Sequence, residues 1–256
     1  MTGPRIAVLG GSGKTGRAVG AALAARGVEA VPLGRAAWAD LPAALRGCGA
    51  AYVIAPNMHP DEPAYVAQVL AACHEAGVPR VVHHSVATPY VLEMPHHLAK
   101  ARAEELVRDS GLRWTVLQPG AYVQNLPLDG SPVRVAYSPD VPFGFAHVGD
   151  VGEAAATVLL EPGHDGVAHE LASFTASVAQ VATAAGGRLE VVAPEEWART
   201  DGADLEPRVR EWLLAMFAYY DTHGLPVSAR PMAALLDRPP TSLTGAVRAA
   251  AGRDPR

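Results

Sequence analysis

The sequence has little cysteine, no run of basic residues and no long apolar segment. Its two cysteines, Cys48 and Cys73, are too few for a disulfide framework and lack the spacing of metal ligands, so we expect no metal site. A formal net charge of −5 without Lys or Arg clusters argues against nucleic acid as a partner. Charges, Pro or Gly interrupt every apolar stretch, and the first residues do not resemble a signal peptide. We therefore expect a cytoplasmic protein, a monomer or homodimer, with a small-molecule substrate and no membrane partner.

Short apolar runs alternate with helical patterns through the first half of the chain. With 256 residues, 49% of them hydrophobic, the chain can bury a large core. The patterns predict strands at 5–9, 28–33, 51–54, 80–84 and 114–117, and helices at 15–26, 41–46, 62–76 and 97–110. This alternation predicts an α/β fold with a doubly wound parallel sheet, the Rossmann arrangement.

The pattern loosens after about residue 128. It predicts helices at 150–160, 177–185 and 206–220, and strands at 168–171 and 189–192. We divide the chain into a Rossmann core for NADP(H), residues 1–150, and a second part, residues 151–256. The second part would hold the remainder of the core and a smaller α/β lobe that covers the substrate.

A glycine-rich turn follows the first predicted strand. Residues 8–16 read VLGGSGKTG, and GKT also ends the phosphate loop of nucleotide triphosphatases. That loop requires a glycine where this chain has Val8, and no later strand ends in the Asp that would hold magnesium. Gly10, Gly13 and Gly16 lie between strand and helix as a dinucleotide turn requires, so Lys14 is interpreted as a turn residue. A plain glycine-rich turn without a ligand remains the alternative.

The end of the second predicted strand indicates which dinucleotide binds. It reads PLGR and places Arg35 19 residues after Gly16, where an acidic residue would pair with the ribose of NAD. An arginine there accommodates a 2′-phosphate, and its planar guanidinium suits phosphate recognition. We therefore predict NADP(H) as cofactor, with an ordinary surface arginine as the alternative.

Several segments together resemble one known family. They are VLGGSGKTG, AYVIAP, HEAGVPRVVHHSV and HLAKARAEELVRDSGLRWTVLQPGAYVQN, followed by AHVGDVGEAAATVLLEP and RPPTSLTGAVRAA. The chain resembles the NmrA-like, atypical branch of the short-chain dehydrogenase/reductase superfamily, which includes isoflavone-reductase-like and quinone- or dye-reducing enzymes. It departs from the family between Arg35 and Asp40. This segment is shorter than usual, so we expect that one strand of the family is missing there.

The resemblance implies roles for matching residues. The pyrophosphate would be contacted by residues of the glycine turn, namely Gly10, Ser12, Gly13, Thr15 and Gly16, and Lys14 of the same turn would also belong to the cofactor site. The remaining cofactor contacts would come from Arg35 at the 2′-phosphate, Ala55 and Pro56 at the adenosine, Lys100 at the nicotinamide ribose, and Pro119 and Gly120 beside the nicotinamide. Ser85 falls where the superfamily has a catalytic serine that also borders the cofactor.

The sequence offers three candidates for the proton donor. The superfamily places a tyrosine four residues before its lysine, on the same helix face, and this chain has His96 there, in HHLAK. An imidazole can donate a proton near neutrality, so we predict His96 as the acid, unless it is a solvated residue just outside the helix. Tyr122 is the second candidate and Tyr90 the third. Glu104 could pair with Lys100, and Asp150 is expected to cap the helix that follows it.

These patterns predict an NADPH-dependent reductase that transfers a hydride to a carbonyl or enone of an aromatic, quinone-like or polycyclic molecule. The missing tyrosine favours an alternative, a non-catalytic NADP(H)-binding sensor that regulates a protein partner. An isomerase or cyclase on the same fold is a third possibility.

Overall fold

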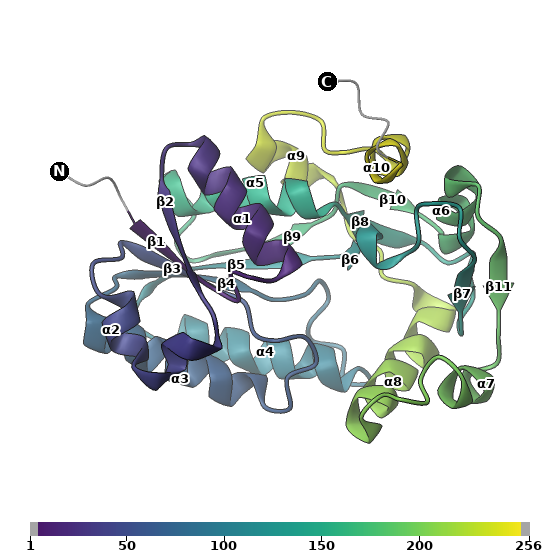
Figure 1. Cartoon of the computed structure of the whole chain (residues 1–256), viewed down its shortest axis with the longest axis horizontal. Coiled ribbons are helices and arrows are strands. Elements are labelled where there is room, and N and C mark those ends of the chain that lie inside the picture. Colours follow the sequence, from purple (N-terminus) through teal and green to yellow (C-terminus); the bar gives the residue numbers. More distant parts are fainter. Residues whose placement is uncertain (1–4, 252–256) are drawn as a thin grey trace.

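The computed structural model describes residues 5–251 and is built around a six-stranded sheet (Figure 1). Its strands lie in the order β2-β1-β3-β4-β5-β9, and every neighbouring pair is parallel. The strands are β1 (Arg5–Leu9), β2 (Glu29–Leu33), β3 (Ala50–Val53), β4 (Arg80–His84), β5 (Arg113–Pro119) and β9 (Val167–Leu171). The predicted fold class is therefore confirmed.

Helices cover both faces of this sheet, as Figure 1 shows. One face carries α1 (Lys14–Ala25) and α5 (Val148–Leu160), and the other carries α2 (Leu41–Leu45), α3 (Glu62–Ala76) and α4 (Pro95–Arg108). Side chains alternate along each strand, so Tyr52 of β3 faces α1 and α5 while Val53 packs toward α3 and α4. A Cβ on Gly152 would lie 2.7 Å from the carbonyl carbon of Ala18, so this glycine permits the close packing of α5 on α1.

Most predicted elements agree with the structure to within two residues. The strands at 5–9 and 80–84 and the helix at 62–76 have the predicted bounds. The helix predicted from residue 97 begins at Pro95, a residue suited to the first helical position, and it therefore includes His96. The prediction that Asp150 caps its helix is wrong, because α5 begins at Val148 with His147 as N-cap.

The short segment after β2 forms no strand. Arg35–Ala39 is a 3-10 helix, and α2 follows directly, so β2 is the edge of the sheet. Because β2 lies on one side of β1 and β3 on the other, the strand order reverses between β1 and β3. In open α/β sheets ligands bind at such a reversal, beyond the carboxyl ends of the strands.

A smaller set of elements forms a second core beside the sheet (Figure 1). Its strands are β6 (Ala121–Tyr122), β7 (Val133–Val135), β8 (Phe143–Ala146), β10 (Phe174–Ala176) and β11 (Leu189–Val191). Its helices are α6 (Val178–Ala185), α7 (Pro194–Arg199), α8 (Pro207–His223) and α10 (Leu243–Ala250), whereas α9 (Arg230–Leu236) packs against α5. We call this set, with α9 excluded, the lobe.

The lobe is centred on aromatic side chains, including Phe143, Phe145 and Tyr220. It contacts the sheet part through the beginning of α4, where His97 hydrogen-bonds the Tyr220 hydroxyl of α8. A helix long and apolar enough to cross a membrane does not occur between residues 5 and 251.

Candidate functional site

The glycine turn lies between β1 and α1, next to the point where the strand order reverses. Gly10 has a φ of 76°, and its amide donates to the Leu33 carbonyl at 3.0 Å. A Cβ on Gly16 would lie 2.3 Å from the Gly10 carbonyl oxygen, and one on Gly10 would lie 3.1 Å from the Ile54 carbonyl oxygen. Backbone occupies the space that side chains would need, so this turn requires glycine at both positions.

The N-terminus of α1 is suited to an anion. Gly13 is its N-cap, and among the residues described no side chain accepts a hydrogen bond from this helix end. The first turn also contains no acidic residue. The first amides and the positive end of the helix dipole can therefore serve a bound phosphate. An uncapped helix behind a glycine-lined turn fits the pyrophosphate of a dinucleotide.

Residues from the segment after β5 close over this turn. The Lys14 ammonium donates to Asn125 Oδ1 at 3.1 Å and to the Gln124 carbonyl at 3.4 Å. The Thr15 hydroxyl lies 3.3 Å from the Tyr122 hydroxyl. Ser12 is exposed, and its carbonyl accepts a hydrogen bond from Arg17. Lys14, the first residue of α1, thus links this helix end to Gln124 and Asn125.

The predicted adenosine contacts lie on either side of β1. Arg35 is exposed and begins the 3-10 helix after β2. Ala55 is buried and Pro56 exposed directly after β3, beside Ile54, which Gly10 approaches. The topology therefore brings all three to the same end of the sheet as the glycine turn, and their cofactor contacts stay predictions.

Lys100 is buried, and its partner is not the predicted one. Its Nζ lies 2.8 Å from Oε1 and 3.1 Å from Oε2 of Glu62, the first residue of α3. The Glu62 side chain is 1% exposed and that of Lys100 11% exposed. Glu62 was not predicted from the sequence. An acidic residue at the start of a helix is ordinarily interpreted as a solvent-exposed residue that interacts with the helix dipole.

Glu104, the expected partner of Lys100, accepts hydrogen bonds from other groups. Its Oε1 accepts from the Ser85 hydroxyl at 2.5 Å and from Gln118 Nε2 at 2.7 Å. Its Oε2 accepts from Arg108 at 3.1 Å and from Tyr90 at 3.3 Å. The hydroxyl of Ser85 is therefore directed at Glu104, and a catalytic role for it stays a prediction.

His96 lies inside α4 and is buried, so the alternative of a solvated histidine outside the helix is wrong. Burial first, and then the charge of Lys100, lower the pKa of His96 to about 3. Its Nδ1 is buried and has no hydrogen-bond partner within the described part of the chain, and its ring lies 6.0 Å from that of Trp212. The imidazole is uncharged at neutral pH, so its N–H is the only proton it can offer there.

Tyr122, the second candidate acid, is enclosed by polar partners. Besides Thr15, its hydroxyl contacts His84 Nε2 at 3.4 Å, and burial raises the pKa of Tyr122. The other nitrogen of His84, Nδ1, lies 2.7 Å from the Tyr52 hydroxyl. Neither Tyr52 nor His84 was predicted as a site residue, since both lie inside apolar strand patterns.

Pro119 and Gly120, predicted as a loop beside the nicotinamide, belong to paired backbone. Pro119 is the last residue of β5, and the Gly120 amide donates to the Leu171 carbonyl at 2.9 Å. A Cβ on Gly120 would lie 2.1 Å from the Gly144 carbonyl oxygen of β8. Glycine is thus required where the sheet and the lobe meet.

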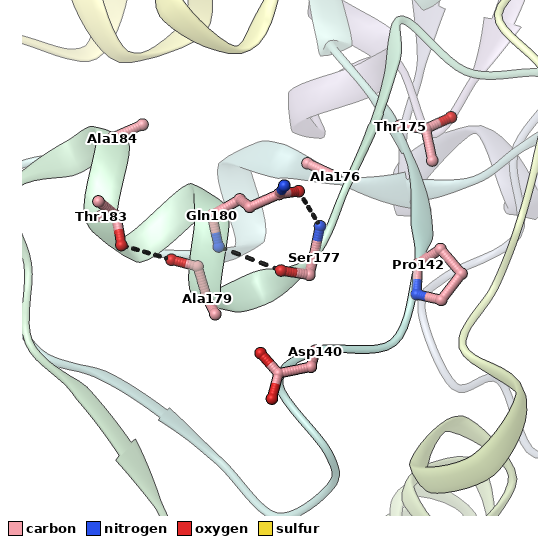
Figure 2. Close-up of a pocket in the computed structure, with 9 residues that line it drawn as sticks. All are labelled: Asp140, Pro142, Thr175, Ala176, Ser177, Ala179, Gln180, Thr183 and Ala184. Atoms are coloured by element: carbon pink, nitrogen blue, oxygen red, sulfur yellow. Dashed lines mark hydrogen bonds between the residues drawn. The ribbon is translucent and has the colours of Figure 1, made fainter.

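A separate hollow of about 610 Å³ lies in the lobe (Figure 2). It lies beside α6. At the beginning of this helix Ser177 and Gln180 form a capping box that supplies hydrogen-bond acceptors to the backbone amides of the helix end. None of the predicted site residues lines it. Within residues 5–251, no group of three or more His, Cys, Asp or Glu side chains could hold a metal ion.

The model of a protein family described as NAD(P)H-binding matches residues 27–162. The chain belongs to this NAD(P)H-binding family. The match begins after the glycine turn, so the assignment of the turn rests on its own geometry. The prediction of a nicotinamide dinucleotide as cofactor is confirmed by the match.

Two curated relatives of this chain are named as reductases. The NAD(P)H azoreductase of Xenophilus azovorans is 30% identical over 177 residues, 65% of this chain and 61% of the relative. The (4-alkanoyl-5-oxo-2,5-dihydrofuran-3-yl)methyl phosphate reductase of Streptomyces griseus is 30% identical over 168 residues, 62% of this chain and 57% of the relative. The chain thus spans about three fifths of the length of these relatives.

Solved structures show the same fold over nearly the whole chain. The NADPH-dependent quinone oxidoreductase QOR2 of Escherichia coli, complexed with NADPH, has a TM-score of 0.80 at 21% identity, covering 95% of this chain and 99% of that one. The Citrobacter sp. triphenylmethane reductase with NADP(H) has 0.77 at 19%, covering 96% and 99%. NmrA, a negative transcriptional regulator, in complex with NADP has 0.78 at 17%, covering 98% and 95%. The fold that the resemblance to NmrA-like proteins implies is therefore confirmed.

Proposed function

We propose that the protein is an NADPH-dependent reductase that transfers a hydride to a conjugated acceptor, a carbonyl or enone of an aromatic, quinone-like or polycyclic molecule. The observation that carries this proposal is the uncharged His96 at the position of the family's proton donor. The Lys100 charge beside it is already balanced by Glu62. A site of this kind offers no strong acid at neutral pH.

Conjugated acceptors suit such a site. When bound, NADPH supplies the hydride, and a quinone or enone spreads the resulting negative charge over its own π-system. Water can then protonate the product, whereas an isolated ketone needs a proton donor for its developing alkoxide. The His96 N–H can still hydrogen-bond the acceptor oxygen, as a neutral imidazole does in other enzymes.

The names of the relatives support this substrate class. They include an azoreductase, a quinone oxidoreductase and a reductase of triphenylmethane dyes. We propose that the acceptor lies between the beginning of α4 and α8, where Trp212 is half-buried beside His96. The lobe would then cover the substrate, while the six-stranded sheet and its helices would hold the cofactor.

The test is oxidation of NADPH, followed by absorbance, with four acceptors: a para-quinone, an azo dye, a triarylmethane dye and an unconjugated aliphatic ketone. We expect turnover with at least one conjugated acceptor and none with the ketone. His96→Phe should retain most of the turnover on the quinone, and Tyr122→Phe serves as its comparison. Faster reduction of the aliphatic ketone, or loss of all turnover in His96→Phe, would refute the proposal.

One observation favours a second function. Lys100, Ser85 and Tyr122 each have a protein partner, which is also expected of a protein that binds NADP(H) without reacting. The sensor hypothesis gains support if NADPH binds tightly and none of the four acceptors oxidises it. Binding of NADP⁺ and NADPH to the same sample, compared by calorimetry, then shows whether the redox state is distinguished.

A further inference from the structure

Four side chains form a hydrogen-bonded chain from the core of the sheet to the first turn of α1. The Tyr52 hydroxyl of β3 lies 2.7 Å from His84 Nδ1 of β4. His84 Nε2 lies 3.4 Å from the Tyr122 hydroxyl, which in turn lies 3.3 Å from Thr15 Oγ1. We call these residues the Tyr52–Thr15 chain.

His84 is the residue that decides the direction of this chain. Burial lowers the pKa of His84 to about 3, so the ring is neutral and carries one N–H. One ring nitrogen must then donate while the other accepts. Two arrangements are possible, and they send the hydroxyl protons in opposite directions along the chain.

Tyr52 distinguishes the two arrangements. Its side chain is fully buried, and in the part of the chain that the structure describes His84 is the hydrogen-bond partner of its hydroxyl. If Nδ1 carried the ring proton, the Tyr52 hydroxyl would accept and its own proton would lie unpaired in the core. Unpaired buried donors carry a free-energy penalty, so Tyr52 donates to Nδ1 and the ring proton resides on Nε2.

The remaining directions follow from this start. His84 Nε2–H donates to the Tyr122 oxygen. The Thr15 hydroxyl could donate to the same oxygen, but the Tyr122 proton would then have no acceptor in the described part of the chain. The Tyr122 hydroxyl therefore donates to Thr15 Oγ1. The Thr15 hydroxyl proton is then the only one in the chain without an acceptor inside it. Thr15 lies in the uncapped first turn of α1, where an anion is favoured by the helix end.

We propose that Tyr52 and His84 are positioning residues that orient the Thr15 hydroxyl as a donor to the diphosphate of the bound dinucleotide. This inference rests on the NAD(P)H site of the proposed function, and it does not depend on the substrate. Neither Tyr52 nor His84 needs to touch the cofactor. Their effect reaches it through Tyr122 and Thr15, so it should be confined to ligands that have a diphosphate.

The first test uses the unaltered protein without ligand. Long-range ¹H–¹⁵N correlation spectra of the histidine rings report which nitrogen carries the proton. We expect the Nε2–H form for His84, assigned by comparison with His84→Gln. The Nδ1–H form, or a charged ring near neutral pH, would overturn the proposal whatever the protein reduces.

The second test measures binding with Tyr52→Phe, by titrating NADPH and adenosine 2′-monophosphate, which lacks the diphosphate. The variant should bind NADPH about three- to tenfold more weakly, the usual effect of one neutral hydrogen bond, with unchanged affinity for the monophosphate. Tyr137→Phe is the matched control, because it removes a hydroxyl from an aromatic cluster of the lobe, outside the Tyr52–Thr15 chain. Equal weakening of both ligands would assign Tyr52 a merely structural role.

A double-mutant cycle tests whether Thr15 carries the effect. In a Thr15→Val background, Tyr52→Phe should cause no further loss of NADPH affinity, whereas Thr15→Ser should keep the Tyr52 effect. Additive losses would overturn the proposal. Failure of the unaltered protein to bind NADPH would overturn it together with the proposed reductase, whereas binding without turnover would overturn only the reductase.

Discussion

Glu62 and Lys100 form an ion pair between α3 and α4, with 2.8 Å between Oε1 and Nζ. The two residues are 38 positions apart in the chain and both are buried. Burying two charges is unfavourable unless they stay paired, so each depends on the other. The lysine that the family resemblance assigns to the nicotinamide ribose is therefore held in place from a neighbouring helix.

Lys100→Ala should lower turnover on any accepted acceptor by about 10²-fold, because it removes the residue that the resemblance assigns to the nicotinamide ribose and so leaves the hydride donor less well positioned. It should also destabilise the fold by about 3–5 kcal/mol, because Glu62 would be left buried and unpaired. The double variant Lys100→Met with Glu62→Leu separates the two effects. Urea unfolding should show most of the stability restored, while NADPH oxidation stays slow; recovered turnover would contradict a role for Lys100.

Arg35→Asp should weaken NADPH binding about tenfold to a hundredfold and leave NADH binding nearly unchanged, because it removes a charge-assisted contact to the 2′-phosphate. Arg46→Asp is the matched control, with the same change of charge at an exposed residue after α2. Fluorescence titration of both cofactors measures the effect. Equal affinities of the unaltered protein for NADPH and NADH would refute the preference.

Gly16→Ala should abolish measurable cofactor binding, since the new Cβ would lie 2.3 Å from the Gly10 carbonyl oxygen and force the turn apart. Gly20→Ala, one turn later in α1, is the control. Its Cβ would meet only the Ala30 Cβ, at an ordinary 3.7 Å, and alanine should stabilise the helix by up to about 1 kcal/mol. Thermal unfolding and NADPH titration compare the two, and a Gly16→Ala protein that still binds NADPH normally would contradict the assignment of the turn.

Stability should fall as the pH is lowered from neutrality, because several histidines are buried uncharged. Burial lowers the pKa of His84 and His96 to about 3 and of His97 to about 4, below the ordinary 6.5. Between these values the unfolded chain binds protons that the folded chain does not, so the free energy of unfolding rises with pH. Each histidine should contribute about 1.4 kcal/mol per pH unit near about pH 5.

Urea unfolding at several pH values measures this slope. His97→Gln should reduce it by about one proton, that is by about 1.4 kcal/mol per pH unit. The glutamine can keep contact with the Thr88 carbonyl and the Tyr220 hydroxyl, which His97 bonds at 3.2 and 3.3 Å. An unfolding free energy that stays constant over this range would contradict the buried, neutral state of these rings.

The sheet and its helices could be predicted because their signals are local. β3 is a fully buried apolar run, and α3 ends at Gly77 in the left-handed conformation, which glycine adopts at little cost. The glycines of the turn are likewise required by backbone that lies within a few residues of them or on the neighbouring strand.

The polar parts of the site could not be predicted in the same way, because their partners come from distant segments. Glu62 reaches Lys100 from another helix, and the lobe helix α8 helps to bury His96. Asp150 also has its partners in distant segments. It was expected to cap a helix locally, yet its carboxylate accepts hydrogen bonds from Ser173, Arg238 and Thr241.

The loss of a strand beyond β2 leaves the sheet with a free edge at Pro32. The Leu33 carbonyl accepts a hydrogen bond from Gly10 and so points toward β1, which means that the neighbouring residue, Pro32, presents its backbone to the open side. Proline has no N–H, so this edge lacks a backbone donor at the penultimate residue of β2, without any loss of pairing to β1. An extended segment of a second molecule that paired with β2 would therefore lack one backbone hydrogen bond. This protects the exposed edge of the sheet against edge-to-edge aggregation.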